Sequence, residues 1–244
     1  MNILAIDTST SRASVALKTN AGELHTASGS GINSHNEELA LLVESLLEQA
    51  KLKASHLDKI LIGSGPGSFT GLRIGFAFAK GLALSCSSAL KSVCSFKAAA
   101  AAGRSCVAGG VLVIADARRE EVFCAAMRID ADAISMLRSP EIISKVRIVD
   151  YAEDLGIYNR AESEKLSVIL LSEISLPPNC QAVAYGNFNL AEGMIFIDLL
   201  GGEEADKFNT AEWLYSLKPN YVREVAARTI AERSAGKHSN APVL

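Results

Sequence analysis

The sequence predicts an α/β fold in which mixed β-sheets are flanked by helices. Along residues 1–105, the residue patterns give three strands, a helix, a strand, a helix, a strand and a helix. A second run of strand patterns begins at Gly109, so the plan restarts there. Because Gly103, Gly109 and Gly110 concentrate turn signals, we expect two domains, residues 1–105 and 106–218.

The first domain is expected to open with a three-stranded antiparallel meander. Asn2 to Ile6 is a short apolar run that ends at Asp7, and residues 13–19 alternate between apolar and polar side chains, as a half-buried strand does. A turn at residues 20–22 then leads into a third strand at residues 23–28.

Two helices and two further strands dominate the rest of this domain. From Ser34 to Ala50 apolar residues follow the three-four step of an amphipathic helix, and Ser34 with Glu37 resembles a capping box. The remaining elements are a strand at Lys59 to Gly63, a helix capped by Ser68 or Thr70 that ends near Ser85, a short strand at Val93 and a helix through residues 98–102.

The second domain shows a clear beginning and weaker signals later. Residues 111–115 and 121–129 are expected to form paired strands. Beyond Ser135 the patterns favour strands at residues 168–171 and 182–185, a loop at Pro177 and Pro178, and a short helix at residues 210–217.

Composition and charge exclude several classes of function. The 24 Lys and Arg against 27 Asp and Glu give a net charge of −3, so no overall positive field favours nucleic acid or an anionic membrane. The apolar stretch Leu72 to Leu84 contains Arg73 and Lys80, which leaves it short of the ~18 uninterrupted residues of a spanning helix. No secretory pattern opens the sequence, so we expect a cytoplasmic protein. The five cysteines form no zinc-type cluster, which favours reduced thiols and no metal site.

The segment Gly65-Pro-Gly-Ser-Phe-Thr-Gly71 lies between a strand and a helix, where backbone N–H groups can bind phosphate. It does not match the dinucleotide fingerprint, because its third glycine comes one place late, and it lacks the Lys of a P-loop. A tight turn that brings two elements close together accounts for the same glycines. The sequence leaves both interpretations open.

Small residues recur at every fourth position of the helix that follows. Gly71, Gly75, Ala79 and Ala83 share one side, and an interior glycine costs ~1 kcal/mol relative to Ala, so a neighbour is expected to approach closely. The pattern does not decide between the protein's own sheet and a helix of another subunit. In the second case Gly75→Leu should prevent association and leave a folded monomer.

Asp7-Thr-Ser-Thr10 lies between two antiparallel strands, which resembles the first phosphate loop of the sugar kinase, Hsp70 and actin superfamily. In that loop the Asp orders magnesium, and a glycine lets backbone amides reach the phosphates. Ser9 stands where that glycine belongs, and the repeat at Asp116 lacks the glycine too. We therefore interpret Asp7, Ser9, Thr10 and Asp116 as a vestigial nucleotide site, with no catalytic residue and no metal.

These motifs together closely resemble the bacterial TsaB (YeaZ) family. The residues that carry the resemblance are Asp7 to Thr10, the helix that begins at His35, Gly65 to Gly75 and Gly81-Leu-Ala, with Asp116-Ala-Arg118, Glu121-Val-Phe123, Tyr185-Gly-Asn187 and Pro219-Asn-Tyr-Val-Arg223 in agreement. The resemblance spans nearly the whole chain and is weak over residues 130–180. It implies the actin/Hsp70/sugar-kinase (ASKHA) fold of two related domains, with residues 219–244 returning to the first domain.

The resemblance also implies a function. TsaB-like proteins are noncatalytic partners of TsaD, a paralogue that transfers threonylcarbamoyl to adenosine beside the anticodon of certain tRNAs. TsaD holds its metal with an HxxxH motif, of which this chain has only His35, because Leu39 takes the second position. In this family TsaB pairs with TsaD, or with itself when alone, the ATPase TsaE docks on the pair, and TsaC supplies the activated intermediate. No cofactor is intrinsic to TsaB, tRNA is reached through the complex, and ATP or ADP at the junction of the subunits is left open.

The family pairs through two helices, which here are residues 34–50 and 70–85. The expected interface residues are Leu39, Leu42, Val43, Leu46, Gly71, Gly75, Phe78, Ala79 and Leu82. A rival interpretation is a small-molecule kinase or ATPase that uses Asp7, Thr10 and Asp116 around magnesium and ATP. A peptidase is a more distant alternative, because the sequence shows no nucleophile paired with a base.

Overall fold

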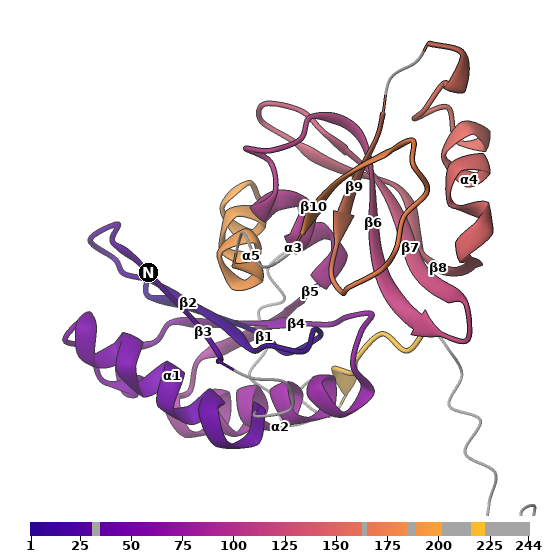
Figure 1. The fold of residues 1–244 in the computed structure, drawn as a ribbon. Helices are drawn as coiled ribbons and strands as arrows, with labels where there is room; N and C mark the ends of the chain where they lie inside the picture. The colour runs from indigo at the N-terminus through magenta and orange to yellow at the C-terminus, as the bar shows by residue number, and fades with distance from the viewer. Residues whose placement is uncertain (31–34, 163–164, 185–188, 202–215, 223–244) are drawn as a thin grey trace, which may run out of the picture.

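The computed structural model describes residues 1–30, 35–162, 165–184, 189–201 and 216–222. These residues form two five-stranded sheets with helices packed against them (Figure 1).

The first sheet has the strand order β3-β2-β1-β4-β5. β1 pairs antiparallel with β2, and β2 with β3, which confirms the predicted meander. β4 and β5 add in parallel on the other side of β1. The elements are β1 (Ile3–Asp7), β2 (Ser14–Lys18), β3 (Leu24–Ser28), α1 (His35–Gln49), a 3-10 turn (Ala54–His56), β4 (Lys59–Gly63), α2 (Phe69–Cys86), β5 (Ala89–Val93) and α3 (Ser95–Ala102).

The second sheet repeats this topology. Its order is β10-β9-β6-β7-β8, so β6, β7 and β8 form an antiparallel meander while β9 and β10 add in parallel beside β6. The elements are β6 (Gly109–Arg118), β7 (Glu121–Ile129), β8 (Ile134–Ser144), a 3-10 turn (Lys145–Arg147), α4 (Ile148–Asp154), a second such turn (Arg160–Glu162), β9 (Leu166–Leu170), β10 (Cys180–Ala184) and α5 (Leu190–Leu199). The predicted α/β architecture of two related mixed sheets flanked by helices is confirmed.

Two helices lie between the sheets and join them. α3 packs against α5, α5 packs on β1 and β2, and α3 packs on β6 and β7 (Figure 1). The core there brings Phe96 together with Leu61 of the first sheet and Val113 of the second. Gly193 permits the close approach of α5 to α3, because a Cβ at this position would overlap the carbonyl oxygen of Ala98.

The other faces of the two sheets are covered by separate helices. α1 and α2 cover the first sheet, where Leu39 and Phe76 pack with Leu4 and Ile62. α4 covers the second sheet in the same way, and Ile148 packs in its core. Both sheets are therefore buried on two faces, which explains why β1, β4 and β6 consist largely of apolar residues.

A buried ion cluster fixes α5 to the first sheet. Asp198 Oδ2 lies 2.8 Å from Lys59 Nζ on β4, and Asp198 Oδ1 lies 3.3 Å from Lys91 Nζ on β5. The Asp198 side chain is 4% exposed, so two ammonium groups and one carboxylate share a site with little solvent. A buried charge is tolerable when it is paired in this way, and the cluster ties the end of α5 to two neighbouring strands.

Three elements were not anticipated from the sequence: β8, α4 and α5. β8 is an edge strand with Pro140 in its interior, which an edge tolerates because the missing N–H faces no partner. α4 is short, with seven residues. α5 is apolar on nearly every side because it lies between two layers, so no polar face marks it as a helix.

Residues 216–222 contact the first domain, at α2 and at the loop that follows β4. Asn220 N donates to Ser64 O at 2.8 Å, and Lys80 Nζ donates to Leu217 O at 2.7 Å. The predictions that fall outside the described residues concern the Ser34 capping box, Tyr185-Gly-Asn187, most of the helix at residues 210–217, and the chain from residue 223 onward. Among the described helices none is long and apolar enough to cross a bilayer.

Candidate functional site

The Asp7 loop is buried and bonded to its own chain. Asp7 Oδ1 accepts hydrogen bonds from Ser9 N at 2.8 Å and from Ser9 Oγ at 2.6 Å. Asp7 Oδ2 accepts one from Ser95 Oγ at 2.6 Å, and Ser95 Oγ in turn accepts one from Gly65 N at 3.0 Å. Ser9, which replaces the expected glycine, therefore donates two hydrogen bonds to the carboxylate that orders the metal in related phosphate loops.

The Gly65–Gly71 segment packs directly on this loop. Ser68 N donates to Ser9 O at 2.7 Å, and Ser68 Oγ caps α2 by accepting from Gly71 N at 3.1 Å. A Cβ at Gly67 would overlap the carbonyl oxygen of Ser9. Gly65 has φ of +87°, a left-handed conformation that suits glycine. Of the two open interpretations, the tight turn and close approach describe these contacts.

Three backbone amides of this segment are already engaged within the chain. The amides of Gly65, Ser68 and Gly71 each donate to an oxygen of the chain. The side chains of Asp7 and Thr10 lie below the surface, at 0% and 7% exposure. A nucleotide at this loop would have to displace several internal hydrogen bonds, each of which contributes ~1 kcal/mol net and costs more when a buried partner is left unpaired.

Asp116 lies in the second sheet, at the end of β6. Its carboxylate is 3.6 Å from Arg118 Nε and 3.9 Å from Lys145 Nζ, and its side chain is 25% exposed. Its backbone N–H donates to Ser172 Oγ at 2.7 Å. Asp116 is therefore paired with Arg118 of its own strand and with Lys145 of the 3-10 turn that follows β8.

The small-residue stripe of α2 faces the protein's own first sheet. A Cβ at Gly71 would overlap the carbonyl oxygen of Thr8, and one at Gly75 would overlap Thr8 Oγ1 and lie 3.2 Å from Ile62 Cδ1. Thr8 Oγ1 also donates to Gly71 O at 2.8 Å, which holds β1 against the helix. A leucine at Gly75 would therefore disrupt this packing, so the expectation that it leaves a folded monomer needs correction.

The nine expected interface residues divide into two groups. Phe78, Leu82 and Leu42 are partly exposed on α2 and α1. The other six lie in the core of the single chain or beneath its helices: Leu39, Val43, Leu46, Gly71, Gly75 and Ala79. A partner can therefore reach the first group directly, while the second positions the helices that carry it.

Between α1 and α2 lies an apolar groove of about 640 Å³, which we call the α1–α2 groove. Its lining residues are Leu39, Arg73, Ile74, Ala77, Phe78, Gly81, Leu82 and Ser85. Seven of these come from α2 and recur at helical spacing, so the groove follows that helix. Gly81 is exposed, and a Cβ there would meet nothing within 4 Å. The groove is thus open at the position where α2 carries no side chain.

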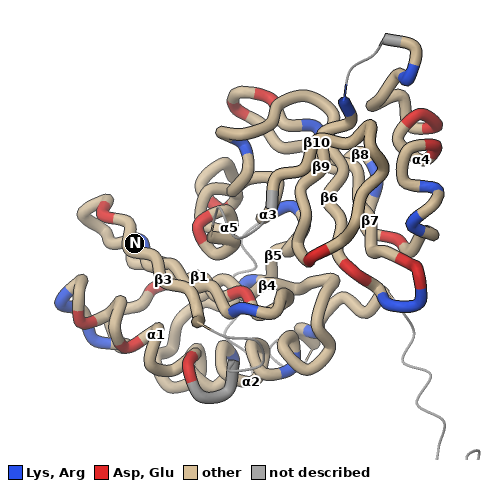
Figure 2. Tube along the Cα trace, viewed as in Figure 1, with Lys and Arg blue, Asp and Glu red and all other residues tan. Residues whose placement is uncertain are grey.

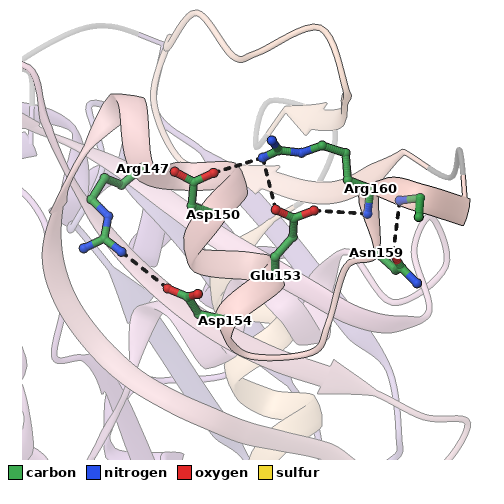
Figure 3. A network of polar contacts seen from close by, with 7 residues as sticks. Arg147, Asp150, Glu153, Asp154, Asn159 and Arg160 are labelled. Atoms are coloured by element: carbon green, nitrogen blue, oxygen red, sulfur yellow. Dashed lines mark hydrogen bonds and ion pairs between the residues drawn. The ribbon is translucent and has the colours of Figure 1, made fainter.

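Other charged and reactive groups in the described residues form no comparable site. The carboxylates of α4 pair with the 3-10 turns on either side of it: Arg160 with Asp150 and Glu153, and Arg147 with Asp154, at 2.9 to 3.3 Å (Figure 3). These side chains are half exposed and satisfy one another, which is typical of a solvated helix face. No group of three potential metal ligands occurs within the described part of the chain. Burial raises the pKa of the Cys124 thiol, and Glu141 raises it further.

Sequence reasoning missed Ser95 and the open position at Gly81. Ser95 is 88 residues from Asp7 in sequence, and the two meet because β4 pairs with β1 on one side and with β5 on the other. The sequence also predicted that Gly81, like Gly75, admits a closely packed neighbour, but a Cβ at Gly81 would meet nothing within 4 Å in the chain.

Comparison with known proteins identifies the family. The family model described as "TsaD: tRNA N6-adenosine threonylcarbamoyltransferase" matches residues 15–229. The tRNA threonylcarbamoyladenosine biosynthesis protein TsaB of Escherichia coli (strain K12) is 35% identical over 150 residues, which cover 61% of this chain and 64% of that protein. The TsaB protein of Bacillus subtilis (strain 168) is 37% identical over 123 residues, or 50% and 53% of the two chains. The matched part spans less than two thirds of the length of these relatives.

Solved structures support the fold. YeaZ from Pseudomonas aeruginosa superimposes with a TM-score of 0.66 at 23% identity and covers 84% of this chain and 96% of that chain. A second Pseudomonas aeruginosa structure, described as similar to peptidase YEAZ, gives a TM-score of 0.68 at 22% identity, with 91% and 99% coverage. By its match to the family model and its identity to the curated relatives, the chain belongs to the TsaD family of proteins and, within that relationship, to the TsaB (YeaZ) family.

Proposed function

We propose that this chain is a noncatalytic subunit that binds TsaD through the α1–α2 groove and supports threonylcarbamoyl transfer to adenosine beside the anticodon of tRNA. The observation that carries the proposal is the contrast between two surfaces of the first domain. The Asp7 loop is closed by hydrogen bonds within the chain, whereas the groove is apolar and open at Gly81.

The shape of the groove suits an α-helix of the partner. A helix packs closely where the facing helix carries small side chains, and Ala77 and Gly81 lie one turn apart on α2. Phe78 and Leu82 supply apolar surface beside them, and burial of such surface provides ~25 cal/mol per Å². The row of small and large residues therefore offers both close approach and apolar contact.

The proposed effect on TsaD is differential binding. A subunit that binds the active arrangement of TsaD more tightly than the inactive one shifts the population toward it, without contributing a catalytic group. In this proposal TsaE docks on the pair, tRNA is bound through the complex in the cytoplasm, and any ATP or ADP is held at the subunit junction.

The rival kinase or ATPase function would need Asp7 and Asp116 to face a metal. Both oxygens of Asp7 already accept hydrogen bonds from Ser9 and Ser95, and Asp116 is paired with Arg118 and Lys145. Metal binding would require these contacts to be exchanged, which the observed geometry does not favour.

Substitution at Gly81 tests the proposal with a control at the same position. Gly81→Leu places a branched side chain in the open part of the groove, and Gly81→Ala adds only a Cβ that meets no other atom within 4 Å. Both remove an interior helix glycine, so each should stabilise the monomer by up to ~1 kcal/mol. We expect Gly81→Leu to weaken TsaD binding at least tenfold, equivalent to ~1.4 kcal/mol, and Gly81→Ala to retain it.

Calorimetric titration of TsaD with each folded variant measures this difference. Equal affinity for TsaD in the Leu and Ala variants would show that the partner binds elsewhere. When the chain is alone, we propose that a second copy occupies the same groove, so light scattering should find a dimer for the unmodified chain and a monomer for Gly81→Leu.

A further inference from the structure

We propose that Phe69, Arg73 and Tyr221 form a platform that binds an unpaired base of RNA together with its phosphate. We call these three side chains the ring platform. The proposed function identifies the RNA as the anticodon loop of tRNA, so the inference rests on that function and adds a direct contact between this chain and the substrate. Three observations support it: the exposure of the two rings, the charge around them and their distance from Gly81.

The two rings of the platform are exposed and adjacent. Phe69, the first residue of α2, is 42% exposed, and Tyr221 is 39% exposed. Among the exposed large apolar side chains of the described residues, these two are the only aromatic ones. Their ring centres lie 5.2 Å apart at an interplanar angle of 44°. A flat base can therefore lie against one ring and meet the edge of the other, and aromatic rings favour both arrangements.

Arg73 places a cation beside the rings. Its guanidinium lies 5.2 Å from the centre of the Phe69 ring, within the range of a cation–π contact. Arg73 is exposed, and no carboxylate of the described residues forms an ion pair with it. A guanidinium has five N–H donors in a fork that matches a phosphate, so Arg73 can bind the phosphate of a base that stacks on the rings.

The chain around the platform is positively charged, although the protein has a net charge of −3. Residues 59–115 contain no Asp or Glu, so Arg73 and Lys80 are the charged residues of α2. Figure 2 shows blue and no red along this helix. Residues 216–222 add Lys218 and no acid. Burial lowers the pKa of Lys80, and the positive charge of Lys218 lowers it further, because no acid lies between the two ammonium groups. An RNA phosphate here meets positive charge that the chain does not neutralise.

The rim of the platform is polar, which favours RNA over a further protein contact. The exposed neighbours of the two rings along the chain are Ser68, Thr70 and Asn220. The α1–α2 groove, in contrast, is lined mainly by apolar side chains. Exposed rings with hydroxyl, amide and cationic groups beside them are typical of sites for single-stranded RNA, in which rings stack on bases and polar groups bind base edges and phosphates.

A partner centred on Gly81 does not need the platform. Gly81 follows Phe69 by twelve residues, which is ~18 Å along the helix at 1.5 Å per residue. Neither ring lines the groove, and Arg73 is the first residue of α2 that does. TsaD or a second copy at Gly81 and RNA at the rings therefore use different parts of α2, so the binding of one does not require the release of the other.

Two substitutions of Phe69 separate the ring from its apolar volume. Phe69→Leu keeps an apolar side chain and removes the flat face, whereas Phe69→Tyr keeps the ring. Titration of the complex with TsaD by a fluorescently labelled anticodon stem-loop measures the RNA affinity. We expect Phe69→Leu to weaken RNA binding at least about fivefold, the loss typical of one stacked base, and Phe69→Tyr to retain it.

Salt dependence tests the phosphate contact of Arg73. The logarithm of RNA affinity falls linearly with the logarithm of salt concentration, and each phosphate contact to a single strand contributes ~0.7 to the slope. Arg73→Gln should therefore reduce the slope by ~0.7, and Phe69→Leu should leave it unchanged. An unchanged slope in Arg73→Gln would contradict the phosphate contact.

Photochemical crosslinking locates the base in the unmodified chain. A stem-loop with iodouridine in its loop forms a covalent bond, on irradiation, with an aromatic ring on which the base stacks. We expect mass spectrometry to find the crosslink in the peptides that contain Phe69 or Tyr221, in the complex with TsaD and, at higher RNA concentration, in the lone chain. This measurement needs no substitution, so it decides the matter even where a variant does not fold.

The affinity for TsaD, measured by calorimetric titration of the same variants, separates this inference from the proposed function. We expect it to be unchanged in Phe69→Leu. Equal RNA affinity of the Leu and Tyr variants, or crosslinks at neither ring, would overturn the platform and leave TsaD binding intact. A loss of TsaD affinity in Phe69→Leu with unchanged RNA affinity would assign the rings to the protein interface and also overturn it. Crosslinks at the rings of a chain that does not bind TsaD would support the platform and refute the proposed function.

Discussion

The buried carboxylate of Asp7 offers the most quantitative test of the closed nucleotide loop. In Asp7→Asn the side chain keeps its size but has one oxygen instead of two. If that oxygen stays with Ser9, the amide group faces Ser95 Oγ, whose proton then has no carboxylate to bond. A buried donor left unpaired costs ~1–3 kcal/mol, and the two Ser9 bonds lose their charge assistance at ~1 kcal/mol each. We expect Asp7→Asn to lower the free energy of unfolding by ~3–5 kcal/mol.

Urea unfolding of four chains measures this effect and assigns it. The unmodified chain, Asp7→Asn, Ser95→Ala and the double variant form a cycle in which the coupling between the two positions should be ~1–3 kcal/mol. The slope of free energy against urea should stay constant, which shows that the same unfolding reaction is measured. A loss below ~0.5 kcal/mol in Asp7→Asn, or a coupling near zero, would refute the view that Asp7 holds the loop closed. Such a result would return Asp7 to the kinase or ATPase interpretation, in which its substitution abolishes ATP turnover.

Other substitutions test the packing and the charges separately. Gly75→Ala should destabilise the chain by ~1–3 kcal/mol, because its Cβ overlaps Thr8 Oγ1; a melting temperature equal to that of the unmodified chain would contradict the packing of α2 on β1. Asp198→Ala leaves Lys59 and Lys91 without their shared carboxylate and should cost ~3–5 kcal/mol, whereas Asp154→Ala removes an exposed pair and should cost ~0–1 kcal/mol. Equal losses in denaturant melts of the two variants would argue against the ion cluster that fixes α5. At pH 8 the exposed Cys106 should be alkylated in the folded chain, while Cys124, whose pKa is raised by burial, should react only on unfolding; early modification of Cys124 in a mass-spectrometric time course would contradict its burial.

The first sheet could be predicted because its elements carry local signals. β1 is a short apolar run, β2 lies in an alternating stretch and α1 has helical periodicity, and Ser68 caps α2 as its position suggested. The repeat at β6 and β7 was visible for the same reason. α5 escaped prediction because a helix buried on nearly all sides shows no period, and β8 because an edge strand accepts Pro140 and polar residues.

The sequence predicted that α1 and α2 carry the candidate site. It did not predict which side of α2 packs on the sheet and which side stays exposed. Small residues at every fourth position of α2, two of them glycine, indicate a close neighbour, and the spacing alone fits either the protein's own sheet or another subunit. The fold decides this question, since Thr8 and Ile62 fill the space beside Gly75. The side of α2 that remains open carries Ala77 and Gly81. Contacts such as Asp7 with Ser95 depend on strand order, which no local pattern contains.

The reconstituted transfer reaction tests the central claim most directly. With TsaD, TsaE and TsaC present, threonylcarbamoyladenosine formed on tRNA is measured with the unmodified chain, Gly81→Leu, Gly81→Ala and Asp116→Asn. Asp116→Asn removes only weak ion pairs in the second sheet, so it should remain folded. We predict loss of product with Gly81→Leu and retained product with Gly81→Ala and Asp116→Asn. Full activity of Gly81→Leu together with loss in Asp116→Asn would contradict the account and place the function in the nucleotide loops.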